Sequence, residues 1–186
     1  MSDRRVNYTK MVLKESLIKL MAEKPIDKIQ IKEICELADV NRGTFYNHYN
    51  DQFDLLRQVQ NEFANEVEAL REKRQSEGMD TTDMIAELVE YLGEQLSLCK
   101  ILFNTNGGNE LINKLMTGSY EVFLETWKQK LKNPSERQLE MLYCFISNGA
   151  SASIRNWVLS DKKETPREVA EFIQKVSLHG SSAFIE

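Results

Sequence analysis

Residues that interrupt helices are scarce in this sequence. Its 186 residues include only 3 prolines and 8 glycines, spread over the whole chain, and leucine, isoleucine, glutamate and lysine dominate. Sheets with many tight turns need more turn residues than this, so the composition favours an all-α fold. With 41% hydrophobic and 28% charged residues, the chain has the balance of a globular protein that can bury a sizeable core without disulfides or metal ions.

Long apolar runs are also absent. A membrane-crossing helix needs ~20 apolar residues in succession, whereas even the apolar stretch 96–103 is interrupted by Lys100. The first residues, 1–5, lead into no apolar segment, so no export signal is expected. We therefore expect a cytoplasmic protein with no membrane partner.

Cysteine and histidine occur too rarely for most metal or nucleophilic sites. Cys35, Cys99 and Cys144 lie far apart within apolar helical patterns, without the spacing of a zinc site or a disulfide framework, and we predict that all three are core thiols. The only histidines are His48 and His179, so no Ser-His-Asp set and no metal-binding histidine motif can be assembled. The sequence therefore indicates neither an enzyme nor a cofactor.

Charge is distributed unevenly along the chain. The net charge of −5 argues against a protein that coats nucleic acid with its entire surface. Residues 1–50 nevertheless carry 9 Lys or Arg against 7 Asp or Glu, whereas residues 51–186 carry 15 against 22. This difference is compatible with a nucleic-acid-binding head on an acidic body, and we predict two domains with these bounds.

Apolar residues recur at helical spacing along most of the chain. Asn41 precedes one such run and is a good N-cap, and Ser135 with Gln138 and Thr165 with Glu168 are capping-box signatures. No strand is expected. The pattern predicts about nine helices, over about residues 9–23, 30–38, 42–49, 51–71, 80–103, 109–116, 120–131, 135–159 and 165–176.

The stretch 29–56 is the most informative part of the chain. It contains two short helices around a tight turn, and an earlier helix can cover their shared apolar face. This is the pattern of a helix-turn-helix unit, whose second helix fits the major groove of B-DNA, about 12 Å wide. In that second helix, Phe45 and Tyr49 can point into the core together. The residues left on the outer face are Arg42, Gly43, Thr44, Tyr46 and Asn47.

The outward residue types suit a DNA surface. Arg42 can pair with the O6 and N7 acceptors of guanine, and Asn47 can pair with adenine or with a phosphate. The hydroxyls of Thr44 and Tyr46 can reach phosphate oxygens. Gly43 has no side chain that would hold the start of the helix away from the DNA backbone. The alternative is a solvated helix surface on which a tyrosine happens to be exposed.

Positive charge is available around this face. The start of the first helix of the unit, near Gln30 and Lys32, can direct its positive end toward a phosphate. Lys10, together with Arg4 and Arg5, is expected to supply mobile positive charge near the N-terminus. These residues complete the predicted DNA-binding surface.

The same segment has a specific arrangement of motifs, namely Thr9-Lys10, Ile31-x-x-Ile34-Cys35, Ala38-Asp39-Val40-Asn41-Arg42-Gly43-Thr44-Phe45-Tyr46-Asn47-His48-Tyr49, Asp51 and Leu55-Leu56. Over about residues 9–56 it closely resembles the DNA-binding head of TetR-type (TetR/AcrR) bacterial transcriptional regulators. The resemblance implies a homodimer of about nine helices per chain that binds a palindromic operator in double-stranded DNA, usually a repressor released by a small ligand, whose identity here is unknown. The C-terminal region, with Gly149, Trp157 and Thr165-Pro166-Arg167-Glu168, is similar to that of Gram-positive members.

Two positions leave parts of this interpretation open. His48 contacts a phosphate, as the resemblance suggests, or fills the edge of the head. Family members commonly have a lysine two residues after the position of Asn50, where it meets a phosphate, whereas this chain has Gln52 next to Asp51. One counterion-releasing contact is thereby lost. The alternative function is therefore a coactivator of the same fold that binds a protein partner and not DNA.

Large side chains recur through the middle of the chain at helical spacing. These side chains either line a ligand cavity or pack in the hydrophobic core, and the sequence leaves both interpretations open. A cavity with such walls would favour an apolar or aromatic ligand. The candidate ligand-binding residues are Phe103, Met116, Tyr120, Phe123, Trp127 and Tyr143.

The last two predicted helices are candidates for a dimer interface. One carries a surface of small residues that would let a partner backbone approach closely, and the other carries an apolar stripe. Paired across a two-fold axis, they would form a four-helix bundle and hold two heads roughly 34–36 Å apart, one turn of DNA. The alternative is that both faces are buried within one chain. The candidate interface residues are Gly149, Ala150, Ser153, Trp157, Val169, Phe172, Ile173 and Val176.

Overall fold

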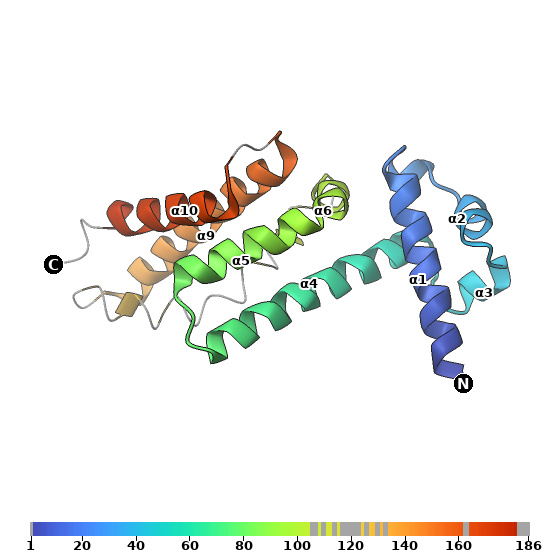
Figure 1. The fold of residues 1–186 in the computed structure, drawn as a ribbon, viewed down its shortest axis with the longest axis horizontal. Coiled ribbons are helices and arrows are strands. Elements are labelled where there is room, and N and C mark those ends of the chain that lie inside the picture. Colours follow the sequence, from blue (N-terminus) through green and yellow to red (C-terminus); the bar gives the residue numbers. More distant parts are fainter. Residues whose placement is uncertain are drawn as a thin grey trace. The chain divides into compact units, whose positions relative to one another are not determined.

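The computed structural model describes residues 2–104, 108, 111–112, 115, 124, 127–128, 131, 134–161 and 164–181. These residues form α-helices and one short 3₁₀ helix and contain no strand, which confirms the all-α prediction (Figure 1). The chain divides into two compact units, Met1–Phe63 and Ala64–Glu186. The elements are α1 (Ser2–Met21), η1 (Ile26–Lys28), α2 (Ile31–Ala38), α3 (Arg42–Tyr46), α4 (Gln52–Ser76), α5 (Thr81–Glu94), α6 (Leu96–Phe103), α9 (Glu136–Leu159) and α10 (Pro166–Gly180).

The first unit is a small bundle in which α1 packs on α2 and α2 packs on α3. Helix α1 begins at Ser2, well before the predicted start at Thr9. Arg4 and Arg5 therefore lie on a helix, and the prediction that they are mobile is corrected. The buried core is formed by Leu13, Leu17, Ile29, Ile34, Cys35, Phe45, Tyr49 and Leu55.

Helix α4 starts where the sequence predicted and ends later. The carboxylate of Asp51 accepts a hydrogen bond from the backbone N–H of Asp54 at 2.6 Å and so caps the start of the helix. The helix continues to Ser76 because its polar C-terminal stretch is rich in good helix formers and forms ion pairs one turn apart. Only Gly78, with a φ of 71°, reverses the chain.

The predicted helix over residues 80–103 is in fact two helices. It breaks at Gln95, whose backbone leaves the helical region, and α6 follows directly. The break lets α6 pack against α9 while α5 packs mainly against α10. Apolar residues continue at helical spacing from Leu92 to Cys99, so the sequence pattern concealed the change of direction.

Helices α9 and α10 begin at the predicted caps. Ser135 and Gln138 form one capping box, and Thr165 and Glu168 form the other, with proline at the first helical position of α10. The predicted helices over 109–116 and 120–131 lie largely outside the described residues. The few residues described there, 111, 112, 115, 124, 127 and 128, are helical.

The cysteines do not all lie in the core. Cys35 and Cys99 are buried as predicted, but Cys144 is exposed. That prediction was wrong because the apolar pattern around Cys144 belongs to a helix with more than one apolar face. Within the described part of the chain, no helix is long and apolar enough to cross a membrane, and no group of side chains is arranged to hold a metal ion.

Candidate functional site

The turn between α2 and α3 is built by local hydrogen bonds. Gln30 and Glu33 form a capping box at the start of α2, with the backbone N–H of Gln30 donating to Glu33 Oε2 at 2.9 Å. Lys24 pairs with the same carboxylate at 2.5 Å, and this contact together with the Gln30 N–H holds the pKa of Glu33 below its usual range. Helix α2 ends at Asp39, which takes the left-handed conformation with φ 52°. Such a residue reverses the chain within a single position.

Helix α3 starts at the predicted N-cap. The side chain of Asn41 accepts a hydrogen bond from the backbone N–H of Gly43 at 2.8 Å. The regular helix ends at Tyr46, earlier than the predicted end at Tyr49. The N–H of Tyr49 still donates to the carbonyl of Phe45 at 3.0 Å, so one further turn holds Tyr49 in place.

Two aromatic side chains orient α3 by burial. Phe45 and Tyr49 are buried in the head with ring centroids 5.6 Å apart, as predicted. Burial raises the pKa of Tyr49 to about 12, so its phenol stays neutral. Because these two residues face the core, the opposite side of α3 faces outward. Arg42, Gly43, Tyr46 and Asn47 are exposed, and Thr44 and His48 are half-buried.

The exposed face of α3 offers free hydrogen-bond donors. Tyr46 is 57% exposed. Within the described residues, neither Arg42 nor Lys10 forms an ion pair, so both positive charges are available. Lys32 is exposed but lies 3.6 Å from Glu36. Gln30 is exposed at the start of α2.

His48 and Gln52 lie at the edges of this surface. The His48 ring lies against Tyr49 with centroids 6.2 Å apart, which agrees with the packing alternative and leaves the ring half-exposed. Gln52 is the first residue of α4 and is half-buried. Next to it, Asn50 donates from its backbone N–H to Asp54 at 3.0 Å, and this bond is the main cause of the lowered pKa of Asp54. The start of α4 therefore carries negative charge.

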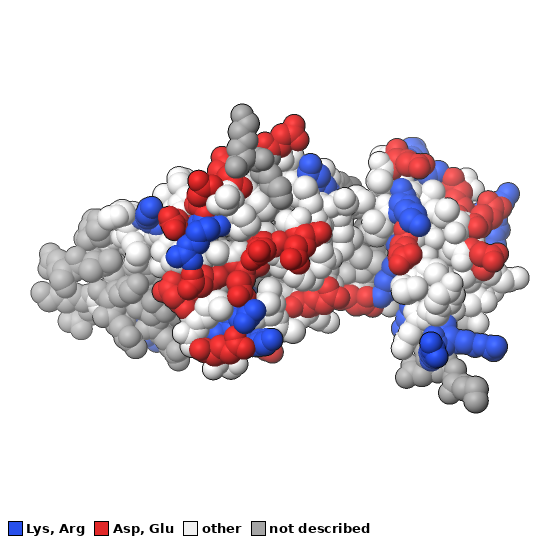
Figure 2. All heavy atoms as spheres, in the orientation of Figure 1, with Lys and Arg blue, Asp and Glu red and all other residues white. Residues whose placement is uncertain are grey.

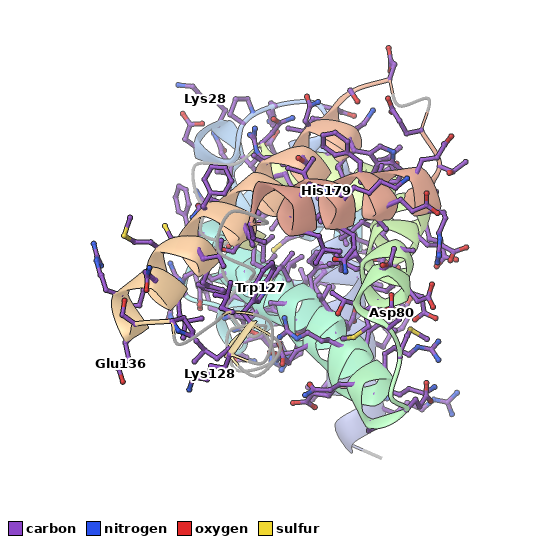
Figure 3. The ribbon with its side chains drawn as sticks, turned by 90° about the vertical axis from the view of Figure 1, so that its left-hand side faces the viewer. Lys28, Asp80, Trp127, Lys128, Glu136 and His179 are labelled. Atoms are coloured by element: carbon purple, nitrogen blue, oxygen red, sulfur yellow. The ribbon has the colours of Figure 1, made fainter. Side chains whose placement is uncertain are left out.

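The second unit contains a partly open cavity of about 200 Å³. Trp127 and Tyr143 are among its lining residues, and Figure 3 shows Trp127 among the interior side chains while its neighbour Lys128 points outward. Phe103 is buried elsewhere in the core and does not line this cavity. The predicted Met116, Tyr120 and Phe123 lie outside the described residues.

Most of the cavity wall was not predicted. It comes from the C-terminal half of α4, from α5, α9 and α10, and from Leu115. Arg71 and Arg74 of α4 reach it, although arginines three apart on a polar helix indicate a solvated face. No signal in the sequence distinguished them. Besides Trp127, the apolar wall residues are Val67, Leu70, Met84, Ile85, Leu88, Leu115, Ile146, Ala150, Ile173 and Leu178.

The face of the second unit that carries α5 is acidic. Figure 2 shows Asp and Glu side chains gathered along α5, where Glu90 and Glu94 are exposed. Such a face repels phosphates. The helix-turn-helix in the first unit therefore offers the better surface for nucleic acid.

Two family models match the chain over these units. The description "Bacterial regulatory proteins, tetR family" applies to residues 15–59, and "Transcriptional regulator C-terminal region" applies to residues 80–179, which is more than half of the chain. The chain belongs to the TetR family of bacterial transcriptional regulators. It thus has the helix-turn-helix DNA-binding head of that family and a larger helical body.

Similar proteins agree with this assignment. The uncharacterized HTH-type transcriptional regulator YxbF of Bacillus subtilis (strain 168) is 40% identical over 47 residues, which are 25% of this chain and only 12% of that protein. A TetR transcriptional regulator from Streptococcus agalactiae 2603V has a TM-score of 0.73 at 17% identity, over 95% of this chain and 97% of the other.

Two further structures share the fold. The fatty acid degradation regulator FadR from Bacillus halodurans has a TM-score of 0.68 at 18% identity, over 92% of this chain and 95% of the other. Thermus thermophilus FadR, a TetR-family repressor in complex with lauroyl-CoA, has a TM-score of 0.58 at 17% identity, over 92% of this chain and 94% of the other. Identities this low establish the fold and not the ligand.

The predicted interface residues of this TetR-family regulator fall into two groups. One group is buried within the chain and consists of Ala150, Trp157, Val169 and Ile173. For these four positions, burial agrees with the alternative that the faces of the two helices are covered by the chain itself and not by a partner. Trp157 donates from its indole N–H to the carbonyl of Glu164 at 3.0 Å and so holds the connection to α10. The other four stay accessible: Gly149, Phe172 and Val176 are exposed, and Ser153 is half-buried.

Sequence reasoning missed two exposed apolar residues on α9. Met141 is exposed, and Phe145 is 72% exposed. They lie four residues apart and therefore on one face of the helix. Phe172 and Val176 of α10, which packs against α9, are exposed as well. Large exposed apolar side chains that lie together mark interaction sites.

Proposed function

We propose that this regulator is a homodimeric repressor that binds a palindromic DNA operator and releases it when a small ligand binds. The first unit would be its DNA-binding part and the second its ligand-binding and dimerisation part. The observation that carries the proposal is the outward face of α3, where Arg42 has no ion pair within the described residues and Tyr46 is exposed. The tight turn and the buried Phe45 and Tyr49 support this orientation.

The dimer is proposed from the apolar surface of α9 and α10. An isologous pair of these helices would form a four-helix bundle and cover Met141, Phe145, Phe172 and Val176. A two-fold dimer presents α3 twice, in successive major grooves of a palindrome. Each contact that one head makes with DNA is therefore made twice per dimer.

Release by ligand is proposed from the course of α4. This helix starts at Gln52, three residues after Tyr49, and its C-terminal half lines the cavity with Val67, Leu70 and two arginines. A ligand that fits the cavity better in one position of α4 shifts the population toward that position. The differential affinity of the ligand for the two states sets the extent of release.

The proposal is tested by selection of genomic DNA fragments on the purified full-length protein. Binding of a recurring palindrome, with affinity that falls steeply as salt rises, is the expected result because several phosphates are neutralised. Failure to retain any DNA at moderate salt, combined with capture of a defined protein partner, would instead establish the coactivator alternative. Gln52 is the feature that favours that alternative.

Gly43→Ala should separate folding from DNA binding. A Cβ built at Gly43 lies 3.4 Å from Asn41 Oδ1, an ordinary contact, so the variant should fold with unchanged or slightly higher stability. On DNA, the added methyl lies between the start of α3 and the sugar-phosphate backbone, and we expect about tenfold weaker operator binding. Gly180→Ala, where a Cβ meets no atom within 4 Å, is the control and should bind normally. Equal operator affinity of the two variants would exclude a close approach at Gly43.

Gln52→Lys should strengthen operator binding. The new ammonium group adds one phosphate contact per subunit, so the slope of log affinity against log salt should become more negative by about 0.9 per subunit, with a gain of about tenfold at low salt. Gln75→Lys adds the same charge at an exposed position of the same helix and should leave the slope unchanged. An unchanged slope for Gln52→Lys would mean that the start of α4 does not face a phosphate.

A further inference from the structure

The side chain of Arg71 is a largely buried positive charge at the cavity wall. It is 14% exposed, lines the cavity, and donates from Nη1 to the carbonyl of Leu115 at 3.0 Å. Its ion-pair partner is Glu68, one turn earlier on α4, which is 42% exposed and therefore screened by water. Burial lowers the pKa of Arg71, the direction expected when a charge is removed from water without full compensation.

Arg74, the other arginine of the cavity wall, is already compensated. Its Nε lies 2.6 Å from a carboxylate oxygen of Glu87 on α5, and its Nη1 lies 2.8 Å from Glu77. The hydrogen bond to Glu77 is the main cause of its raised pKa. Two acidic groups thus satisfy Arg74, and it braces α4 against α5. Of the two arginines, Arg71 is the one that can still gain from an anion.

The rest of the cavity limits the size and polarity of an occupant. Its volume of about 200 Å³ is somewhat more than the roughly 150 Å³ of an apolar cavity that holds benzene. Aliphatic side chains and Trp127 supply most of the wall, and Tyr143 contributes a phenol that interacts electrostatically with Arg71. A single ring or a short aliphatic chain fits this space.

We propose that the cavity binds a small monocarboxylic acid with an apolar body, and that Arg71 binds its carboxylate. This rests on the proposed function, in which the same cavity holds the releasing ligand. A carboxylate presents two oxygens to the planar guanidinium, and such charge-assisted hydrogen bonds are strong where water is excluded. The ligand competes with Glu68 for Arg71, so binding changes an ion pair within α4 itself.

The test is calorimetric titration of the full-length protein with benzoate, phenylacetate and hexanoate, each compared with its amide. The acid and the amide of a pair have nearly the same shape and differ in charge. At least one acid should bind ten times more tightly than its amide. Equal binding of acid and amide in every pair, or no binding of any probe, would overturn the proposal.

Variants of Arg71 test whether this residue causes the preference for the acid over its amide. Arg71→Gln should remove the preference for the acid, whereas Arg71→Lys should keep part of it because the charge remains. Lys73→Gln, which removes a positive charge from an exposed position of the same helix, should bind like the unchanged protein. A preference that survives in folded Arg71→Gln would overturn the assignment, and melting curves verify folding. Operator binding by the ligand-free protein, measured on the same samples, tests the proposed function separately.

Discussion

Replacing Arg42 by alanine should weaken operator binding between about 30-fold and 10⁴-fold. A bidentate arginine–guanine contact contributes about 1–3 kcal/mol of discrimination, and a symmetric dimer loses it twice. The loss arises on DNA and not in folding, because the side chain is exposed and forms no ion pair within the described residues. The free energy of unfolding should therefore change by less than about 0.5 kcal/mol.

The measurement is fluorescence anisotropy with the selected operator and with operators altered at one base pair per half-site. Arg42→Ala should lose the discrimination at one base pair in each half-site, and Arg42→Lys should lose most of it because an ammonium group cannot form the planar pair. Lys28→Ala is the control, since it removes an exposed positive charge from the same unit. If Lys28→Ala and Arg42→Ala lost equal operator affinity, Arg42 would contribute only nonspecific electrostatic attraction to DNA.

Phe145→Glu should convert the proposed dimer into monomers. Truncation of an aromatic residue at the centre of an interface costs about 2 kcal/mol or more, and two-fold symmetry doubles this, so the dimer dissociation constant should rise about 10³-fold. A buried carboxylate adds to the cost. The monomer should fold normally because Phe145 is 72% exposed within the chain. Operator affinity should fall with it, since one head makes half of the contacts.

Molar mass by light scattering over a range of concentrations measures this change. Leu37→Glu, the same type of substitution at an exposed apolar residue of α2, should leave the mass unchanged. Gly149→Gln gives a second assay, because a Cβ there meets no atom of its own chain within 4 Å and glutamine favours the helix. It should raise the stability of the monomer and weaken the dimer. An unchanged molar mass for both Phe145→Glu and Gly149→Gln would place the dimer contact elsewhere.

The helix-turn-helix could be predicted because its signals are local. The cap at Asn41 acts on a backbone N–H two residues away, and Phe45 and Tyr49 are placed on one face by helix geometry alone. The capping boxes of α9 and α10 are local in the same way. Such features need no knowledge of which other helix packs against them.

The sequence by itself determined the fold class, the starts of α3, α9 and α10 and the outward face of α3, since the signals for these features lie within one or two helical turns. Only the tertiary structure decided the break at Gln95, the exposure of Cys144 and the burial of Trp157. Only the tertiary structure showed, likewise, that Arg71 lines a cavity, because the sequence of its helix is polar. The physical reason is that burial depends on the neighbouring helices, and an amphipathic pattern shows that a face is covered without showing by what.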